Sequence, residues 1–224
     1  MIILLAWNVR NLSRNERSIY ISEMPKVTQE HLDARRAQIL EAAERCFARQ
    51  GFHATTMQDV LRESQLSTGA VYRYFPSKND LVNAVGEQSL ASAAPRLEAV
   101  LLAEPVPSPA EAVGGVVAAI DPFAGTDGSL RMAVQVWGES LRDDGIAALA
   151  RTGYGRLRGL FIQYVERAVS AGILPAETDA TSAGQAYFGL VPGYILQRLL
   201  LGDVSPDTYT TGLRAILKGA DREP

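Results

Sequence analysis

Residues 54–82 read ATTMQDVLRESQLSTGAVYRYFPSKNDLV, and this stretch decides the fold. It predicts two short helices separated by a three-residue turn. The first covers Met57–Ser64, where Thr55 and Thr56 offer N-cap oxygens and Gln58 and Asp59 are capping-box partners. The second begins at Thr68 and ends before Pro76, because proline disfavours helical geometry in the residue that precedes it.

Longer helices are expected on both sides of this pair. Apolar residues recur at helical spacing over Gln29–Gln50, and Gly51 follows as a residue that can take positive φ and end the helix. Downstream, Ser77 caps a further helix that carries Asp80 at its third position and extends to about Ser92. Two short helices that pack against a longer one are typical of a helix-turn-helix unit, whose second helix fits the major groove of DNA.

The second short helix has the chemistry of a DNA reader. Thr68, Gly69 and Ala70 are small, so the amide groups at the helix N-terminus can come close to phosphate. Tyr72 and Tyr74 supply hydroxyl donors for phosphate oxygens, and Arg73 can pair with guanine or contact the backbone. Lys78 adds a cation two residues beyond Pro76.

These residues resemble the DNA-binding signature of the TetR family of transcriptional regulators. The resemblance spans Arg35 to Val85, and its most specific part is the string VYRYFPSK at residues 71–78. It implies an all-helical, homodimeric repressor with an N-terminal reader and a C-terminal effector-binding domain. The implied base-facing residues are Thr68, Gly69, Ala70 and Arg73, with Gln58 also within reach of bases. The implied phosphate contacts are Thr56, Tyr72, Tyr74 and Lys78.

Two positions depart from that pattern. Gln65 stands in the turn where the family usually has glycine, and Leu61 stands where a small alanine is common. A residue other than glycine at positive φ costs about 1 kcal/mol. We therefore expect a turn that is slightly strained or reshaped and still compatible with DNA binding.

The remainder of the chain also reads as helices, which predicts an all-α protein. The expected helices are Ala112–Ile120 with an N-cap at Ser108, Ser129–Leu141, Ala148–Ala171, Thr178–Leu201, and a last helix from Ser205-Pro206 through Ile216. Residues 1–24 are expected to be an N-terminal extension, disordered or upstream of a true start at Met24. Residues 25–84 would form the helix-turn-helix domain, with the motif at about 56–75, and residues 85–220 the effector-binding and dimerisation domain.

The composition fits this division and places the protein in the cytoplasm. The chain has 224 residues and a net charge of −3; residues 25–82 hold eight basic and seven acidic residues, and residues 83–224 hold eleven and sixteen. The acidity therefore belongs to the C-terminal part. Cys46 is the single cysteine and no apolar run approaches the roughly 18 residues that cross a bilayer, so we expect neither disulfides nor a membrane partner.

A dimer interface is predicted on the apolar segment Thr178–Leu201. Small residues recur there every three or four positions, which lets another helix approach closely. One interpretation is a buried core helix; the favoured one is a four-helix interface with symmetry mates. The predicted interface residues are Ala183, Ala186, Gly193, Leu196 and Leu200, with Leu157, Phe161, Tyr164, Val165 and Ala168 from the preceding helix. Pro192 should kink the segment.

A pocket for a small hydrophobic or aromatic effector is expected among the C-terminal helices. Its predicted lining combines apolar side chains with a few hydroxyl or indole groups: Met132, Val136, Trp137, Phe161, Tyr187, Phe188 and Tyr194. The competing interpretation is that this aromatic stripe is ordinary core.

Enzymatic interpretations find little support. The two histidines and one cysteine do not supply a zinc site, and no phosphate-binding glycine loop or serine nucleophile elbow occurs. No cofactor, metal or catalytic residue is therefore predicted, and Cys46, beside Phe47, is expected in the core. Two functions remain open: a ligand-released repressor on a palindromic DNA operator, or a helical small-molecule-binding module with a vestigial helix-turn-helix.

Overall fold

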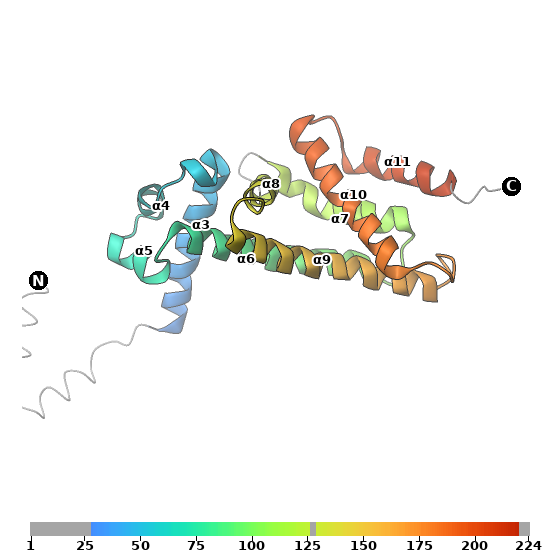
Figure 1. The fold of residues 1–224 in the computed structure, drawn as a ribbon, viewed down its shortest axis with the longest axis horizontal. Coiled ribbons are helices and arrows are strands. Elements are labelled where there is room, and N and C mark those ends of the chain that lie inside the picture. Colours follow the sequence, from blue (N-terminus) through green and yellow to red (C-terminus); the bar gives the residue numbers. More distant parts are fainter. Residues whose placement is uncertain (1–27, 126–128, 220–224) are drawn as a thin grey trace, which may run out of the picture. The chain divides into compact units, whose positions relative to one another are not determined.

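The computed structural model describes residues 28–125 and 129–219, so the predicted extension at residues 1–24 lies outside the described residues. Over these ranges the chain is helical and contains no β-strand, which confirms the predicted all-α class (Figure 1). None of the described helices is both long and apolar enough to cross a membrane.

Helix α3 covers Gln29–Ala54 and spans two compact units of the chain, which divide between Ala37 and Gln38. In the first unit, the Gln29 amide donates a hydrogen bond to Asp33 at 2.9 Å. In the second, α3 is interrupted at Gly51, where φ is +82°. This is the position where a helix end was predicted. Everything that follows concerns the second unit, from Gln38 onward.

Helices α4 (Met57–Ser64) and α5 (Thr68–Tyr74) form the predicted helix-turn-helix. Thr56 and Asp59 make the predicted capping box, an arrangement that contributes about 1 kcal/mol to helix stability. Gln65 takes the left-handed conformation with φ of +57°, so the residue that replaces glycine does adopt positive φ. The side chain of Gln38 donates to the Ser64 carbonyl at 2.8 Å and thereby satisfies one of the carbonyl groups at the end of α4.

Helix α6 (Lys78–Leu101) begins at its predicted cap, Ser77, but extends nine residues beyond the predicted end at Ser92. The extension passes through Pro95. Pro95 and Ala91 are both exposed, so water can hydrate the carbonyl that loses its amide donor. A proline inside a helix is tolerated where that hydration is available.

The helix-turn-helix has its own hydrophobic core. Phe47, Val60, Val71 and Leu81 are fully buried in it, and Phe75 is nearly so. Full burial of a side chain of this size stabilises the fold by roughly 1.5 to 3 kcal/mol. Cys46 is also fully buried there, as expected, and Leu61 packs against the same cluster. Because Val71 and Phe75 hold one face of α5 inward, the opposite face is left to solvent.

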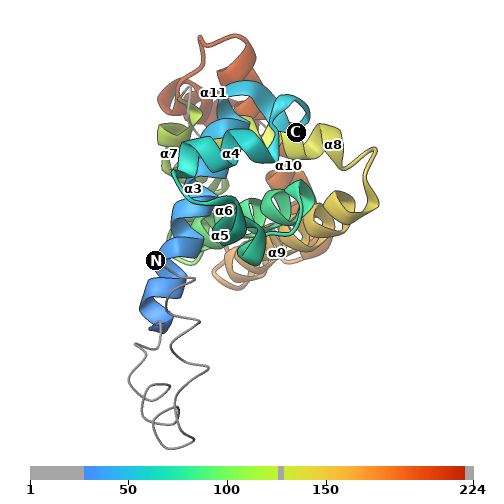
Figure 2. The same ribbon diagram turned by 90° about the vertical axis from the view of Figure 1, so that its left-hand side faces the viewer.

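Six further elements follow α6: α7 (Pro109–Ile120), the 3-10 turn η1 (Asp121–Ala124), α8 (Ser129–Glu139), α9 (Asp144–Ser170), α10 (Ala180–Leu200) and α11 (Pro206–Gly219). Helix α9 packs against both α6 and α10, whereas α11 packs against α7 (Figure 1). Figure 2 shows the same elements from the end at which α4 and α5 lie. Helix α10 runs through Pro192 as a single element, and the kink predicted there stays a prediction.

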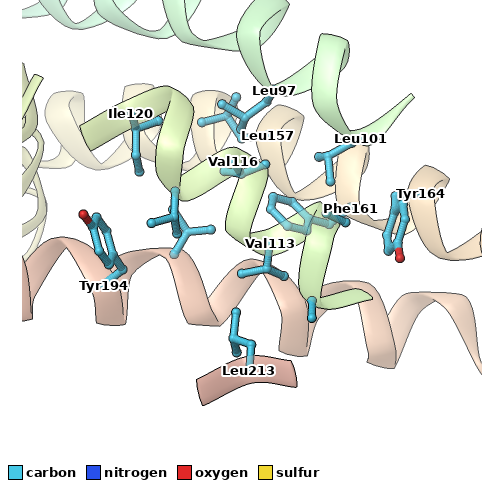
Figure 3. Close-up of a cluster of buried hydrophobic side chains, with 14 of the residues drawn as sticks. Leu97, Leu101, Val113, Val116, Ile120, Leu157, Phe161, Tyr164, Tyr194 and Leu213 are labelled. Carbon is cyan, nitrogen blue, oxygen red and sulfur yellow. The ribbon is translucent and has the colours of Figure 1, made fainter. Parts of the chain in front are cut away.

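A second hydrophobic core joins these helices (Figure 3). Leu97 and Leu101 of α6, Val113 and Val116 of α7, and Phe161 of α9 lie within it. Helices α9 and α10 approach closely at Gly184, where a Cβ atom would lie 2.8 Å from backbone atoms of Ile162. Part of the small-residue pattern of α10 therefore serves packing within the chain.

This core corrects half of the predicted dimer interface. The side chains predicted to reach a second copy from α9 are directed inward instead: Leu157, Phe161, Tyr164, Val165 and Ala168. Four of these are fully buried and Leu157 is 9% exposed. They belong to the core that α9 shares with the neighbouring helices of its own chain, so they are not available to a partner.

Candidate DNA-binding surface and effector cavity

The exposed face of α5 carries four of the predicted DNA-contacting residues. Thr68, Gly69, Tyr72 and Arg73 are exposed, and the Tyr72 side chain is 43% exposed despite its size. A Cβ atom at Gly69 would meet open space. An exposed helix face with one arginine, one tyrosine and small residues at its N-terminal end suits a groove of DNA.

The first helix of the motif adds two exposed polar residues. Thr56 caps α4, and its hydroxyl also donates to Asp59 at 2.7 Å. The backbone amide and hydroxyl of Thr56 hold the pKa of Asp59 below its ordinary value, which keeps the cap ionised. Gln58 is exposed as the second residue of the helix, where its amide is available to a ligand.

Three predicted contacts are placed differently from the rest. Ala70 is half-buried, and the Tyr74 ring packs against the core of the motif while remaining half-exposed. The Lys78 ammonium group donates to the Phe52 carbonyl at 2.8 Å and to the His53 carbonyl at 3.5 Å. Lys78 therefore holds the end of α3, a role that sequence reasoning missed, and its third N–H remains for phosphate.

Several other cationic side chains near the motif form ion pairs with acidic residues of the motif itself. Arg45 and Arg49 of α3 pair with Glu63 of α4 at 2.8 Å and 3.1 Å, and their hydrogen bonds lower the pKa of Glu63. Arg62 pairs with Asp59. Arg73, by contrast, makes no ion pair with any residue in the described part of the chain. Its guanidinium group is therefore the cation best placed for DNA.

A cavity of about 130 Å³ lies among α6, α7, α8, α9 and α10. Five of the seven predicted lining residues do line it: Met132, Val136, Trp137, Phe161 and Phe188. Sequence reasoning missed the walls that α6 and α7 contribute, because the periodicity of one helix does not show which neighbour it faces. The missed lining residues include Leu90, Leu97 and Val116, together with Tyr154 of α9.

The remaining two tyrosines lie outside the cavity. The hydroxyl of Tyr194 donates to Asp121, which also accepts a hydrogen bond from Arg198 at 2.8 Å. This arrangement ties the start of η1 to α10. The Tyr187 ring packs edge-on against Tyr164, with 6.3 Å between ring centroids. Their prediction as effector contacts was therefore wrong for the cavity that the chain forms.

Aromatic rings form one wall of the cavity. Tyr154 contacts Trp137 and Phe188 edge-to-face, with centroid separations of 5.9 and 6.0 Å, and Phe188 contacts Phe161 in the same way at 5.8 Å. The indole N–H of Trp137 donates to the Tyr154 hydroxyl oxygen. Burial raises the pKa of Tyr154 to about 12, so this hydroxyl stays protonated at neutral pH.

Helix α8 lies between the cavity and the helix-turn-helix. Met132 and Val136 line the cavity and also belong to the core of the DNA-binding motif. Between them, Gln135 accepts a hydrogen bond from the Phe52 amide and donates to the Phe47 carbonyl. At the end of α8, Glu139 lies 2.7 Å from His53. One short helix thus contacts both candidate sites.

The α10 half of the predicted interface remains accessible. Ala186, Leu196 and Leu200 are exposed and Gly193 is half-buried, whereas Ala183 packs against the core. Exposed apolar residues continue beyond the prediction, with Leu201 at 69% and Ile216 of α11 at 71% exposure. Exposed large apolar side chains are therefore present on α10 and on α11, whereas the predicted interface side chains of α9 are buried.

Family models match both parts of the chain. The model for bacterial regulatory proteins of the tetR family matches residues 39–85, and that for the C-terminal region of BetI-type transcriptional repressors matches residues 109–221, half of the chain. The chain belongs to the TetR family. The members of this family are DNA-binding transcriptional regulators rather than enzymes.

Curated relatives of this TetR-family chain are also HTH-type regulators. The regulator YfiR of Bacillus subtilis is 52% identical over 66 residues, which cover 30% of this chain and 32% of that protein. The first three such relatives are matched over only 24% to 35% of their own length. The regulator TtgR of Pseudomonas putida is 28% identical over 185 residues, covering 80% of this chain and 87% of that protein.

Solved structures share the fold. Salmonella enterica GusR aligns with a TM-score of 0.70 at 23% identity, covering 87% of this chain and 97% of that one. A transcriptional regulator from Saccharomonospora viridis, solved in complex with choline, aligns with a TM-score of 0.68 at 25% identity, covering 83% and 96%.

Proposed function

We propose that this chain is a repressor that binds a palindromic DNA operator as a homodimer and is released by a small hydrophobic effector. Residues 25–84 would read DNA and residues 85–220 would bind the effector and the second copy, in the cytoplasm. The observation that carries the proposal is the double role of Met132 and Val136, which belong both to the cavity wall and to the core of the DNA-binding motif.

The contacts of α8 explain how an effector would act on DNA binding. A ligand that displaces Met132 or Val136 must shift side chains on which the DNA-binding motif packs, because a packed core transmits a displacement. A coupling free energy of about 1 to 3 kcal/mol would change operator affinity roughly 5- to 150-fold. The shift would act on the motif through Gln135 and its two hydrogen bonds.

A homodimer would present two copies of α5 to one duplex. Half-sites on one face of DNA are about 34 to 36 Å apart, so the position of each α5 sets whether both copies bind. The exposed apolar surface of Leu196, Leu200, Leu201 and Ile216 supports pairing through α10 and α11. Leu196, Leu200 and Leu201 lie within six residues of one another at the end of α10, and exposed apolar patches mark surfaces of association.

A gel-shift titration tests the proposal. The probe is the DNA upstream of the chain's own coding region, at 50 and 200 mM salt. A shifted complex that weakens steeply with salt is expected, because each neutralised phosphate releases counterions. Absence of any sequence-specific complex would favour the alternative, a small-molecule-binding module with a vestigial helix-turn-helix.

A further inference from the structure

We infer that the cavity beside Trp137 takes an uncharged ligand of about one ring in size that carries a hydrogen-bond acceptor, and that Tyr154 selects this acceptor. The inference deepens the proposed function by naming the ligand class of the same site. It is carried by the composition of the lining, the size of the cavity and the direction of one hydrogen bond.

The lining contains no group that could balance a charge. Tyr154 is its single ionisable residue; the rest is aliphatic or aromatic apart from Ser89 and Ser129. A carboxylate or ammonium ion would lose its hydration there without a partner, which costs several kcal/mol. The ligand is therefore neutral.

The aromatic wall does not compensate for a missing carboxylate. A cation gains most when several ring faces surround it. Here Trp137, Tyr154, Phe188 and Phe161 pack in series, at interplanar angles of 62° to 67°. In each edge-to-face pair one ring face is covered by the edge of its neighbour, which removes that face from contact with a ligand. A choline-like cation is consequently a poor match.

The volume limits the size of the ligand. An apolar cavity of about 150 Å³ in another protein admits benzene. The cavity here is about 130 Å³, which suits one six-membered ring or a branched group of similar size. A long acyl chain exceeds that volume.

Tyr154 supplies the polar contact. An indole N–H can only donate, so in the Trp137 pair the Tyr154 oxygen is the acceptor and its own proton is directed elsewhere. The described residues give that proton no acceptor. With a pKa of about 12 the hydroxyl keeps the proton at neutral pH and offers it to a carbonyl, ether or hydroxyl oxygen of the ligand.

Two isosteric ligand pairs test the inference by calorimetric titration of the full chain. Choline and 3,3-dimethyl-1-butanol have the same shape and differ in charge, whereas anisole and ethylbenzene differ in one ether oxygen. We expect the butanol to bind at least tenfold tighter than choline. We expect anisole to bind about fivefold tighter than ethylbenzene, the effect of one hydrogen bond. Tighter binding of choline, or equal binding of anisole and ethylbenzene, would overturn the inference.

Variants separate the role of Tyr154 from simple packing. Tyr154→Phe should abolish the preference for anisole while ethylbenzene still binds, because the ring remains and the proton donor is lost. Retention of the preference would remove Tyr154 from this role. Ala93→Leu fills the cavity from α6 and should weaken the binding of all four ligands, while cooperative unfolding shows that the variant is still folded. Unchanged binding would show that the ligands bind elsewhere. These measurements omit DNA, so ligand binding without operator release would contradict the proposed function alone.

Discussion

The side-chain oxygen of Gln135 accepts a hydrogen bond from the backbone amide of Phe52 at 3.2 Å, across 83 residues of sequence. Phe52 directly follows Gly51, where positive φ interrupts α3. The amide nitrogen of the same glutamine donates to the Phe47 carbonyl at 3.4 Å. Gln135 therefore bonds from α8 to two backbone groups of α3, one on each side of the interruption at Gly51.

Replacement of Gln135 should weaken both stability and regulation. In Gln135→Ala the Phe52 amide is left partly buried without a partner, which costs about 1 to 3 kcal/mol. Urea unfolding measures this loss, and Gln163→Ala, at an exposed position of α9, is the matched control. The variant should also respond less to effector in the gel shift. A variant as stable and as responsive as the unmodified chain would exclude Gln135 from the coupling.

Arg73, the one cation of α5, should contribute strongly to DNA affinity. Loss of a guanidinium contact to a base or phosphate costs about 1 to 3 kcal/mol, so Arg73→Ala should weaken operator binding roughly 5- to 150-fold. If the variant loses its preference for one base pair of the operator, Arg73 contacts that base. If it loses affinity equally for all sequences and its affinity depends less steeply on salt, Arg73 contacts a phosphate. Arg131→Ala, on the exposed side of α8, is the control. Unchanged affinity in Arg73→Ala would contradict the assignment.

Lys78 and Tyr72 should behave differently, although both were predicted to contact phosphate. Tyr72 is exposed, so Tyr72→Phe should lower DNA affinity and leave the urea midpoint unchanged. Lys78 also donates hydrogen bonds to the carbonyl groups of Phe52 and His53. Lys78→Ala should therefore lower both the DNA affinity and the urea midpoint, with a loss of about 1 kcal/mol in the free energy of unfolding. If the urea midpoint of Lys78→Ala stays unchanged, its bonds to α3 add nothing to folding.

Local chemistry made the DNA-binding motif predictable. The caps at Thr56 and Ser77, the break at Gly51 and the positive φ of Gln65 all depend on residues adjacent in sequence. Contacts across long separations were not predictable in this way. An apolar stripe does not show whether it faces its own chain or a second copy, which explains why Phe161 was assigned to an interface and lies in the core. Gln135 carried no signal at all, because its partners are backbone atoms.

A charge on the exposed face of α10 should separate the two copies of the proposed dimer. Ala186→Glu and Leu200→Glu each place a carboxylate where two symmetry-related copies would meet, so like charges would be desolvated together. Sedimentation should then report a monomer at micromolar concentration. Leu141→Glu is the control, since Leu141 is 87% exposed in the turn between α8 and α9. Persistence of the dimer in both variants would exclude α10 from the interface.

Asp121 should make stability depend on acid pH. Burial opposes ionisation of this carboxyl, but hydrogen bonds from Tyr194 and Arg198 outweigh that effect and hold its pKa below the ordinary value of 3.8. A carboxyl with a lowered folded-state pKa stabilises the fold above pH 3.8, and this contribution is lost as pH falls through the folded-state pKa. Asp121→Asn keeps the acceptor oxygen and removes the charge, so its urea midpoint should be lower than that of the unmodified chain at pH 7. The difference between the two midpoints should shrink as pH falls below 3.8, whereas a difference that stays the same from pH 7 into acid would show that the charge of Asp121 contributes nothing to the link between η1 and α10.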